Sequence, residues 1–369
     1  MSLLKISPVQ SSADRREFLS FPYDFYQQDP YWVPPLRLDQ KMLFDPAKHP
    51  FYRHGTVQGF LARRAGRTVG RISAILDPNY SLFHDEKAGF FGFLEMIDDQ
   101  EVATGLLTSA RDWLVARGAQ VIRGPVNPST NYECGVLVDG FDSSPRIMMT
   151  YNPPYYGPRI EAAGLRKAKD LVAYDLPVAK ARAGRVRVLT ERAESNGVHL
   201  RTLRLDDYDN EVERAWGIYN SAWAKNWGFV PMTSAEFMHH GHELKQILIP
   251  DLAWIAEVDG QAIGFALAIP DINEALHHIR GRLLPFGLFK LLWYKRKIEY
   301  LRVIVLGVKQ EFRQTPAAAA LYAALIRECA RLKFRGAECS WILEDNVLMR
   351  RSIEALGGTV YKTYRIYEF

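Results

Sequence analysis

The sequence contains few cysteines. Among its 369 residues there are three, Cys134, Cys329 and Cys339, and no two of them have the CxxC spacing. A disulfide framework or a zinc ribbon needs paired cysteines at characteristic spacings, so this odd and scattered set argues against both. It is typical of a protein that works in a reducing cytoplasm.

A long apolar run is also missing. The longest nearly apolar stretch, Leu283–Tyr294, is interrupted by Pro285 and Lys290. It falls short of the about 20 residues that a membrane-spanning helix needs. The chain does not open with a basic and then apolar leader, since Met1–Pro8 has the pattern of a strand, and we expect no secretory signal. The expected location is the cytoplasm.

Neither sign of charge dominates. The chain has 47 Lys and Arg against 42 Asp and Glu, a net charge of +5, and 48% of its residues are hydrophobic. This composition is that of globular domains and argues against disorder. The slight basic excess suits an anionic small molecule and is weak evidence for specific nucleic-acid binding, for which we would expect a pI above about 9 and a clustered basic face. The length favours two domains.

The chain contains an internal repeat. Phe60–Asp77 and Trp254–Asp271 align at an offset of 194 residues, and each has two extended apolar runs around a glycine turn, the pattern of a β-hairpin. Three pairs correspond at this offset: Gly66 with Gly260, Gly70 with Gly264, and Asp77 with Asp271.

Two further blocks extend the repeat. They are Trp113–Val126 with Arg331–Glu344 at an offset of 218, and Ile160–Gly164 with Ile353–Gly357 at 193. Insertions at Ile272–Lys295 and Pro128–Asn152 account for the changes in offset. We therefore predict two copies of one module, 1–178 and 198–369, joined by a linker at 179–197, with a helical insertion at 272–297 in the second copy.

Each module is predicted to have the element order β-α-α-β-β-β-α-β-α-β, a mixed α/β sheet flanked by helices. In the first module, the predicted elements around the hairpin are Leu4–Val9, Ala13–Gln27, Leu36–Phe44, Gly89–Ile97, Glu101–Arg117, Val121–Gly124, Tyr155–Ala163 and Leu165–Leu176. In the second they are Val198–Arg204, Asn210–Ala224, Ser234–Ile247 with Ser234 as N-cap, Tyr300–Val308, Ala317–Leu332, Glu338–Ile342, Val347–Leu356 and Thr359–Phe369.

This order resembles the fold of the GNAT superfamily of N-acetyltransferases, in the tandem form found in bacteria. The family's phosphate-binding motif, Arg/Gln-x-x-Gly-x-Gly/Ala, is matched after the strand Val303–Val308 by Arg313 at its first position and Ala318 at its last. Free amides at a helix N-terminus bind anions. Pro316 stands where the family has a glycine and lacks an N–H. The alternative is an ordinary strand–loop–helix capped by Thr315.

The resemblance implies acetyl-CoA or another acyl-CoA as co-substrate, and no metal. The cofactor-binding residues that it implies are Leu306, Gly307, Val308, Arg313, Gln314, Thr315, Ala317, Ala318 and Asn346. A backbone N–H near Gly307 would polarise the acyl oxygen. In the first module the equivalent stretch, Asp98–Glu101, is acidic and would repel a pyrophosphate, so that module is predicted to lack the cofactor.

The family's catalytic tyrosine is replaced by Ile353. A tyrosine suits the protonation of a leaving thiolate because the two pKa values are close. Tyr361 and Tyr364 are candidates to replace it, and we assign Tyr364. Glu344, just past a strand, is the candidate general base. The alternatives are that the tyrosines only pack the sheet and that the carboxylates serve the next helix, with Asp345 as its N-cap.

Two loops are candidates for the acceptor site, which would take a small-molecule amine or a peptide. One contains Asn226, Trp227 and Phe229, and the other contains Asn131 and Tyr132. Aromatic side chains in a connecting loop favour a ligand cleft, but a loop folded onto its own core would look the same. The histidines of His239–His242 are interpreted as a solvated helix face, not a metal site.

The insertion 272–297 is both basic and apolar. It predicts peripheral membrane contact or a cover over an acyl chain, with a helical lid or a dimer contact as the alternatives. The leading hypothesis for the whole chain is a CoA-dependent N-acyltransferase acting on an unidentified amine. The alternatives are a non-catalytic acyl-CoA or small-ligand binding protein on a degenerate GNAT fold, and an aminoacyl-transferring tandem enzyme.

Overall fold

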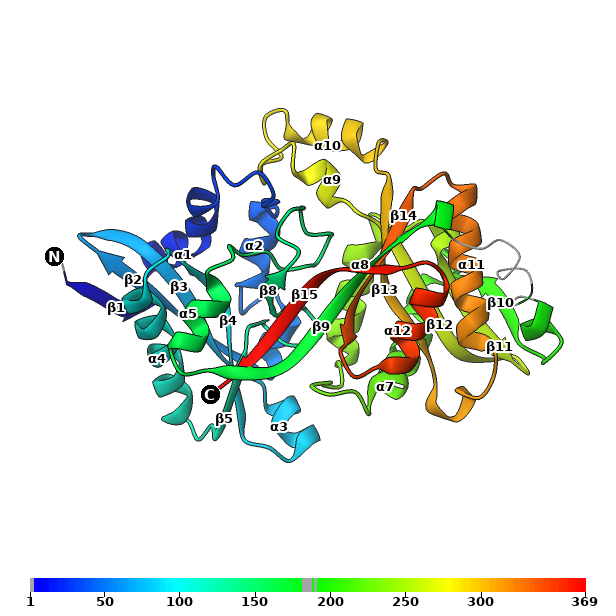
Figure 1. Ribbon diagram of the computed structural model, residues 1–369, viewed down its shortest axis with the longest axis horizontal. Helices are drawn as coiled ribbons and strands as arrows, with labels where there is room; N and C mark the ends of the chain where they lie inside the picture. The colour runs from blue at the N-terminus through cyan, green and yellow to red at the C-terminus, as the bar shows by residue number, and fades with distance from the viewer. Residues whose placement is uncertain (1–2, 181–187, 189–190) are drawn as a thin grey trace. The chain divides into compact units, whose positions relative to one another are not determined.

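The computed structural model describes residues 3–180, 188 and 191–369 (Figure 1). The predicted linker 179–197 contains residues 181–187 and 189–190, which lie outside the described residues. The chain divides into two compact units. Unit 1 is Met1–Leu171 with Leu276–Leu288 and Lys362–Phe369, and unit 2 is Val172–Ala275 with Phe289–Tyr361.

The first half of the chain forms the elements of unit 1 and one strand that continues into unit 2. In chain order they are β1 (Leu4–Pro8), α1 (Ser12–Phe25), α2 (Arg37–Leu43), η1 (Pro50–Arg53), β2 (Thr56–Arg64), β3 (Arg67–Leu76), α3 (Pro78–His84), β4 (Ala88–Met96), α4 (Gln100–Val115), β5 (Val121–Gly124), β6 (Val126–Asn127), β7 (Glu133–Cys134), β8 (Val136–Asp139), α5 (Tyr156–Ala162) and β9 (Arg166–Pro177).

The second half ends with a strand that returns to unit 1. Its elements are η2 (Val178–Lys180), β10 (His199–Thr202), α7 (Tyr208–Trp223), α8 (Ser234–Lys245), η3 (Pro250–Leu252), β11 (Ala253–Val258), β12 (Gln261–Pro270), α9 (Asn273–Leu276), α10 (Gly287–Lys295), β13 (Tyr300–Val308), η4 (Gln310–Phe312), α11 (Ala317–Arg331), β14 (Gly336–Leu343), α12 (Val347–Ala355) and β15 (Thr359–Glu368).

Both units contain a mixed sheet, as predicted. In unit 1 the strands follow the order β1-β2-β3-β4-β5-β15, and in unit 2 the order β9-β14-β13-β12-β11-β10. The β4–β5 and β13–β14 pairs are parallel, and the hairpins are antiparallel. Gly70 opposes Met96 in unit 1, and Gly264 opposes Val308 in unit 2. The two glycines that correspond in the sequence therefore occupy the same register position, which confirms the repeat.

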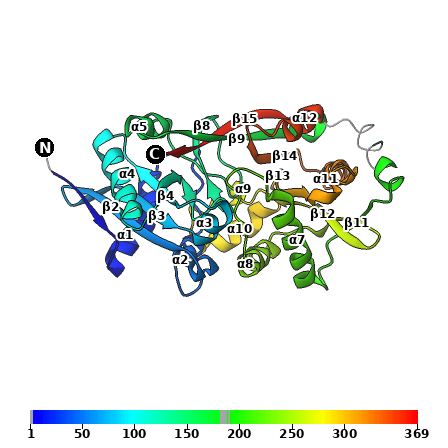
Figure 2. The same cartoon turned by 90° about the horizontal axis from the view of Figure 1, so that it is seen from below.

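Each sheet carries helices on both faces (Figure 2). In unit 2, Ala266, Leu306 and Val308 belong to the core under α11, whereas a Cβ on Gly307 would meet Trp223 and Ala222 of α7. Successive residues of a strand point to opposite faces, so α7 and α11 cover opposite sides of this sheet. Unit 1 has a corresponding core between its sheet and α4.

The predicted elements agree with the observed ones to within a few residues, and Tyr300–Val308 has the predicted bounds. The N-cap predicted at Ser234 is wrong. The cap is Thr233, whose backbone is extended and whose side chain accepts from the Glu236 N–H, while the Glu236 carboxylate accepts from the Thr233 N–H. This reciprocal capping box fixes the helix start one residue earlier.

Candidate active site

Two parallel strands of unit 2 separate partway along their length. Pairing between β13 and β14 runs from Tyr300 opposite Gly336 to Val303 opposite Cys339 and then stops, although β13 continues to Val308 and β14 to Leu343. The register of β12 with β13 also shifts at this point, where Ile304 of β13 has no partner in β12. We call the space between residues 304–308 and 340–343 the unit 2 wedge.

The helix that follows β13 has a proline at its N-cap position. Pro316 has no side-chain acceptor for the amides of the first turn. Thr315 lies one residue earlier, where its hydroxyl donates to the Phe312 carbonyl and accepts at 3.4 Å from the Ala317 N–H. Thr315 therefore engages the first N–H of α11, as the sequence-based alternative supposed, although the N-cap position is Pro316. Since Ala318 is exposed, this end of α11 can receive an anion.

The equivalent helix of unit 1 begins with its own anion. The Asp99 carboxylate accepts from the Glu101 and Val102 N–H groups at 2.9 and 3.2 Å. Arg64 hydrogen-bonds this carboxylate at 2.6 Å and lowers its pKa. The start of α4 is thus occupied by an ionised side chain from the acidic stretch that was noted in the sequence.

The space between the parallel strands of unit 1 is also filled by the chain itself. Pairing of β4 with β5 ends at Phe90. The Asn127 side chain then accepts from the Phe93 N–H at 2.6 Å, and the Tyr156 hydroxyl accepts from the Met96 N–H at 2.9 Å. A Cβ on Gly92 would lie 1.7 Å from a carbonyl oxygen of the facing segment. Unit 1 therefore satisfies two amides of β4 beyond its parallel pairing with side chains of its own.

A buried polar cluster lies where the unit 2 wedge begins. Arg302 and Glu338 are register partners, with 3.5 Å between Nε and Oε1, and both are 1% exposed. Arg302 Nε donates to the Ser340 hydroxyl at 2.9 Å, and the Tyr361 hydroxyl donates to Glu338. Burial raises the pKa of Glu338, and the charge of Arg302 opposes this shift. The sequence analysis missed this cluster.

Trp341, which follows Ser340 in β14, has an unusual backbone conformation. Its φ is +56°, a value that residues with bulky side chains rarely adopt. The Arg302 guanidinium lies 4.5 Å from the centroid of the Trp341 ring. Strained residues persist where the surrounding structure holds them, and they concentrate at functional sites. The strained residue and the charged pair together mark the narrow end of the wedge.

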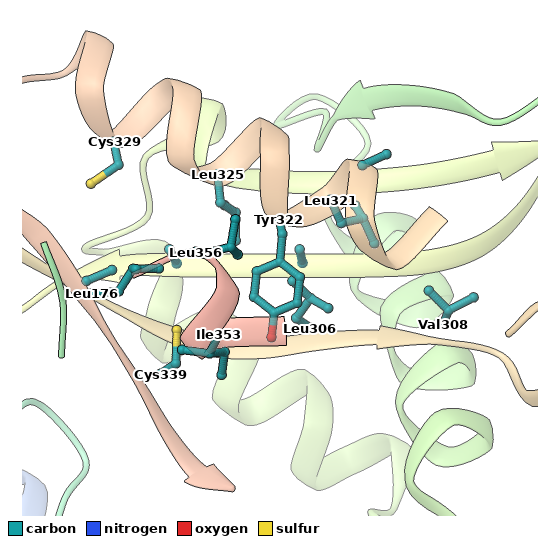
Figure 3. Packing of buried hydrophobic residues seen from close by; sticks show 14 of the residues in the cluster. Leu176, Leu306, Val308, Leu321, Tyr322, Leu325, Cys329, Cys339, Ile353 and Leu356 are labelled. Atoms are coloured by element: carbon teal, nitrogen blue, oxygen red, sulfur yellow. The ribbon is translucent and has the colours of Figure 1, made fainter. Parts of the chain in front are cut away.

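An apolar cavity adjoins the same point on the α11 side of the sheet. Val303 and Cys339 are among its lining residues, together with Tyr322 and Leu325 of α11. Figure 3 shows Tyr322 extending from α11 toward Ile353, and its hydroxyl donates to the Met349 sulfur at 2.7 Å. A tyrosine from a different helix thus lies beside the isoleucine that replaces the family tyrosine.

The predicted cofactor-binding residues are spread along the wedge and the helix after it. Leu306 and Val308 point into the core, and Ala317 is buried in the first turn of α11. Gln314 is exposed, as is Arg313, whose guanidinium donates to the Ala222 carbonyl at the end of α7. In this structure Arg313 therefore caps a helix C-terminus.

Asn346 is the N-cap of α12. Its side chain accepts from the Met349 N–H at 3.2 Å. The sequence-based alternative that Asp345 caps this helix is therefore wrong, because the chain turns into the helix one residue later.

The two predicted catalytic residues lie in different units. Glu344 follows β14 in unit 2, and its backbone carbonyl accepts from Arg350 at 2.8 Å. Tyr364 is fully buried on the part of β15 that belongs to unit 1, opposite Leu137 of β8. The assignment of either residue to catalysis stays a prediction.

The two predicted acceptor loops are also in different units. Asn226 and Phe229 lie in the turn after α7, where the Phe229 ring is buried 5.7 Å from that of Tyr219. Trp227, between them, is half-buried. In unit 1, Asn131 precedes Tyr132, which is buried against His49. Both loops are thus partly folded onto their own cores.

The histidines of α8 are engaged with carboxylates. His239 and His240 lie 3.3 and 3.4 Å from Glu243, and His242 lies 3.0 Å from Asp209. The side chains of His239 and His240 are 24% and 17% exposed, so these two contribute little to the solvated face that was expected. Among the described residues, no group of three or more His, Cys, Asp or Glu side chains could hold a metal ion.

The His239–Glu243 pair predicts a pH-dependent contribution to stability. Hydrogen bonding to Glu243 raises the pKa of His239, and the two histidines lower the pKa of Glu243. The contribution is therefore present near pH 5–6 and is lost as the pH rises through the raised pKa of His239. We expect His239→Gln to lower the free energy of unfolding by up to about 1 kcal/mol near pH 6. Urea denaturation at several pH values measures this, and an equal loss at pH 9 would contradict it.

Solved structures define the class of fold. The chain is similar over its whole length to a tandem GNAT protein from the clavulanic acid biosynthesis pathway, with a TM-score of 0.58 and 14% identity over 98% of that chain. It is also similar to a GCN5-related glucosamine N-acetyltransferase region of a fungal β-N-acetylglucosaminidase, with a TM-score of 0.61 and 14% identity over 38% of that chain. The protein therefore has a tandem GNAT fold.

Closer relatives define the family. No family model matches the chain. It is 39% identical to the bacterial ceramide synthase of Caulobacter vibrioides over 99% of its own length and 97% of that protein. It is 36% identical to the protein YghO of Escherichia coli over 96% and 92% of the two lengths. The chain belongs to the family of these two proteins.

Proposed function

We propose that this protein is an N-acyltransferase that moves a long acyl chain from acyl-CoA to the amine of a sphingoid base. The observation that carries acyl transfer is the separation of β13 and β14 in unit 2 beside the start of α11, whose N-cap position is a proline. The acceptor class is taken from the relative named as a ceramide synthase, which matches nearly the full length of both chains.

In the proposed reaction the amine nitrogen attacks the thioester carbonyl carbon directly. A C–N bond forms and the C–S bond breaks, so the product is an amide and the leaving group is the CoA thiolate. The amine loses a proton to a base, for which Glu344 is the candidate, and the thiolate takes up a proton. A backbone N–H of β13 near Gly307 would stabilise the developing oxyanion.

The two units would have different tasks. In unit 2 the pyrophosphate would lie at the start of α11 and the pantetheine along the wedge. Unit 1 fills the equivalent positions with Asp99 and Asn127. We therefore expect one acyl-CoA per chain.

The test is an assay with purified protein, palmitoyl-CoA and sphinganine. The expected result is release of free CoA thiol that requires the amine, together with an N-acyl product detected by mass spectrometry. Serinol, which carries the amino alcohol without the alkyl chain, is the control for recognition of a lipid acceptor. Equal rates with both amines would contradict the sphingoid-base assignment.

A non-catalytic role is the second candidate, because Ile353 stands where the family has its tyrosine. Palmitoyl-CoA binding at one molecule per chain by calorimetry, without thiol release with any amine, would favour this alternative. Acyl transfer from aminoacyl-tRNA but not from acyl-CoA would favour an aminoacyl-transferring enzyme.

Arg313 offers a test of the cofactor site. If its guanidinium turns from the Ala222 carbonyl to the pyrophosphate, Arg313→Ala should weaken CoA binding by about 1–3 kcal/mol, the cost of a lost charge-assisted hydrogen bond. Arg335→Ala is the matched control, since that arginine is exposed and pairs with Glu299. Unchanged CoA affinity in calorimetry, with the folded state retained, would mean that Arg313 only caps α7.

A further inference from the structure

One short segment of the described chain carries a group of exposed apolar side chains. Six of its large exposed apolar side chains lie within ten residues: Leu284, Phe286, Leu288, Phe289, Leu292 and Trp293. None of the residues of α10 is buried. Isolated apolar residues are common on protein surfaces, but a continuous group of this kind marks an interaction site.

The exposed apolar residues of α10 share one face. Phe289, Leu292 and Trp293 are spaced i, i+3 and i+4 and are 72%, 54% and 59% exposed. Leu291 and Tyr294 lie on the opposite face of the helix and are half-buried. The helix is thus attached to the protein by one side and presents an apolar face with a tryptophan on the other.

The same segment is strongly basic. Its six basic residues are all exposed: Arg280, Arg282, Lys290, Lys295, Arg296 and Lys297. No acidic residue lies between Glu274 and Glu299. The Lys297 ammonium lies 5.1 Å from the Trp293 ring centroid, so basic and apolar groups occupy one surface. Lys295 instead donates to the Gln246 carbonyl.

We propose that α10 and the loop before it bind the surface of an anionic membrane. Exposed aromatic and aliphatic side chains enter the boundary between headgroups and acyl chains, and flanking lysines and arginines pair with lipid phosphates. A nine-residue helix is shorter than the about 20 residues that span a bilayer, so it would lie in the interface. A second copy of this chain is a poorer partner, because two such basic faces repel each other.

If the proposed function holds, this surface brings the protein to its lipid acceptor, since sphingoid bases partition into membranes. Membrane binding depends on the exposed residues of α10 and the loop before it, and it does not require that the protein be an acyltransferase. Its test can therefore fail or succeed independently of the acyltransferase assay.

The experiment is co-sedimentation of the full chain with vesicles of phosphatidylcholine alone and of phosphatidylcholine mixed with phosphatidylglycerol. We expect the wild-type protein to partition at least about tenfold more strongly to the anionic vesicles, and added salt to reduce the difference. The triple variant Phe289→Ser, Leu292→Ser and Trp293→Ser should lose binding to both compositions. The double variant Lys290→Glu and Lys297→Glu should lose the preference for anionic lipid.

The controls are Leu82→Ser, which removes another leucine that is 85% exposed, and Arg67→Glu at an exposed hairpin turn. Both should bind vesicles as the wild type does. Thermal unfolding checks that every variant is folded. Equal binding of the triple variant and the wild type would overturn the proposal. So would a lipid-free dimer in analytical ultracentrifugation that the triple variant abolishes, since that result would assign the face to a second copy.

Discussion

Replacing Pro316 by aspartate is expected to weaken CoA binding by about 2–4 kcal/mol, the interaction of two like charges about 4 Å apart near a protein surface. Pro316→Asp reproduces in unit 2 the N-cap that unit 1 already has in Asp99. The new carboxylate would accept from amides of the first turn of α11 and repel the pyrophosphate that is proposed to bind there. Calorimetry with CoA measures the change in affinity.

The stability of the variant should change little. A new cap contributes about 1 kcal/mol, and losing the rigidity of proline in the unfolded chain costs a similar amount. Pro316→Ser is the matched control, because it caps the helix without a charge and should weaken CoA binding less. Wild-type affinity in a folded Pro316→Asp protein would show that the phosphates bind elsewhere, and the division of tasks between the units would lose its main support.

The order of elements could be predicted because it depends on local patterns. Strand Tyr300–Val308 is a nearly continuous apolar run, and α11 repeats its buried residues at helical spacing. The glycine turns Gly66 and Gly260 have φ +75° in both hairpins, which explains why the repeat is visible at these positions. Only glycine adopts that conformation without cost.

The composition of the units could not be predicted in the same way. Strand β15 begins in unit 2 and ends in unit 1, where Tyr367 pairs with Gly124. A terminal strand is recognised by its alternating residues, but this pattern does not say which neighbour it joins. The assignment of Tyr364 to the site of the second module assumed that neighbours in sequence stay in one unit.

The buried cluster of the wedge was missed for a related reason. Arg302 and Glu338 each interrupt an apolar strand, and one charge in such a strand gives no sign of its partner. The sequence did contain a sign of the cluster: Arg302 and Glu338 are opposite charges at corresponding positions of two strands joined by a helix. Parallel strands place such positions side by side.

This pair gives the largest expected effect on stability. Glu338→Ala should lower the free energy of unfolding by about 3–5 kcal/mol, because it leaves the charge of Arg302 buried without its carboxylate. Tyr361 would also lose the acceptor of its hydroxyl proton. Urea denaturation measures the change. Glu338→Gln should cost less, since the amide oxygen can still accept from Tyr361.

The double variant Arg302→Met and Glu338→Leu distinguishes the cost of an unpaired buried charge from the cost of lost packing. Replacing both members of a buried ion pair by apolar residues of similar size is often neutral, so we expect this protein to be more stable than Glu338→Ala alone. The Arg302 guanidinium also lies against Trp341 and hydrogen-bonds Ser340, so the double variant should bind acyl-CoA less well even where it folds normally. If the double variant is instead as unstable as Glu338→Ala, the cost comes from lost packing at the start of the wedge, and the pair does not act as a charge-balanced unit.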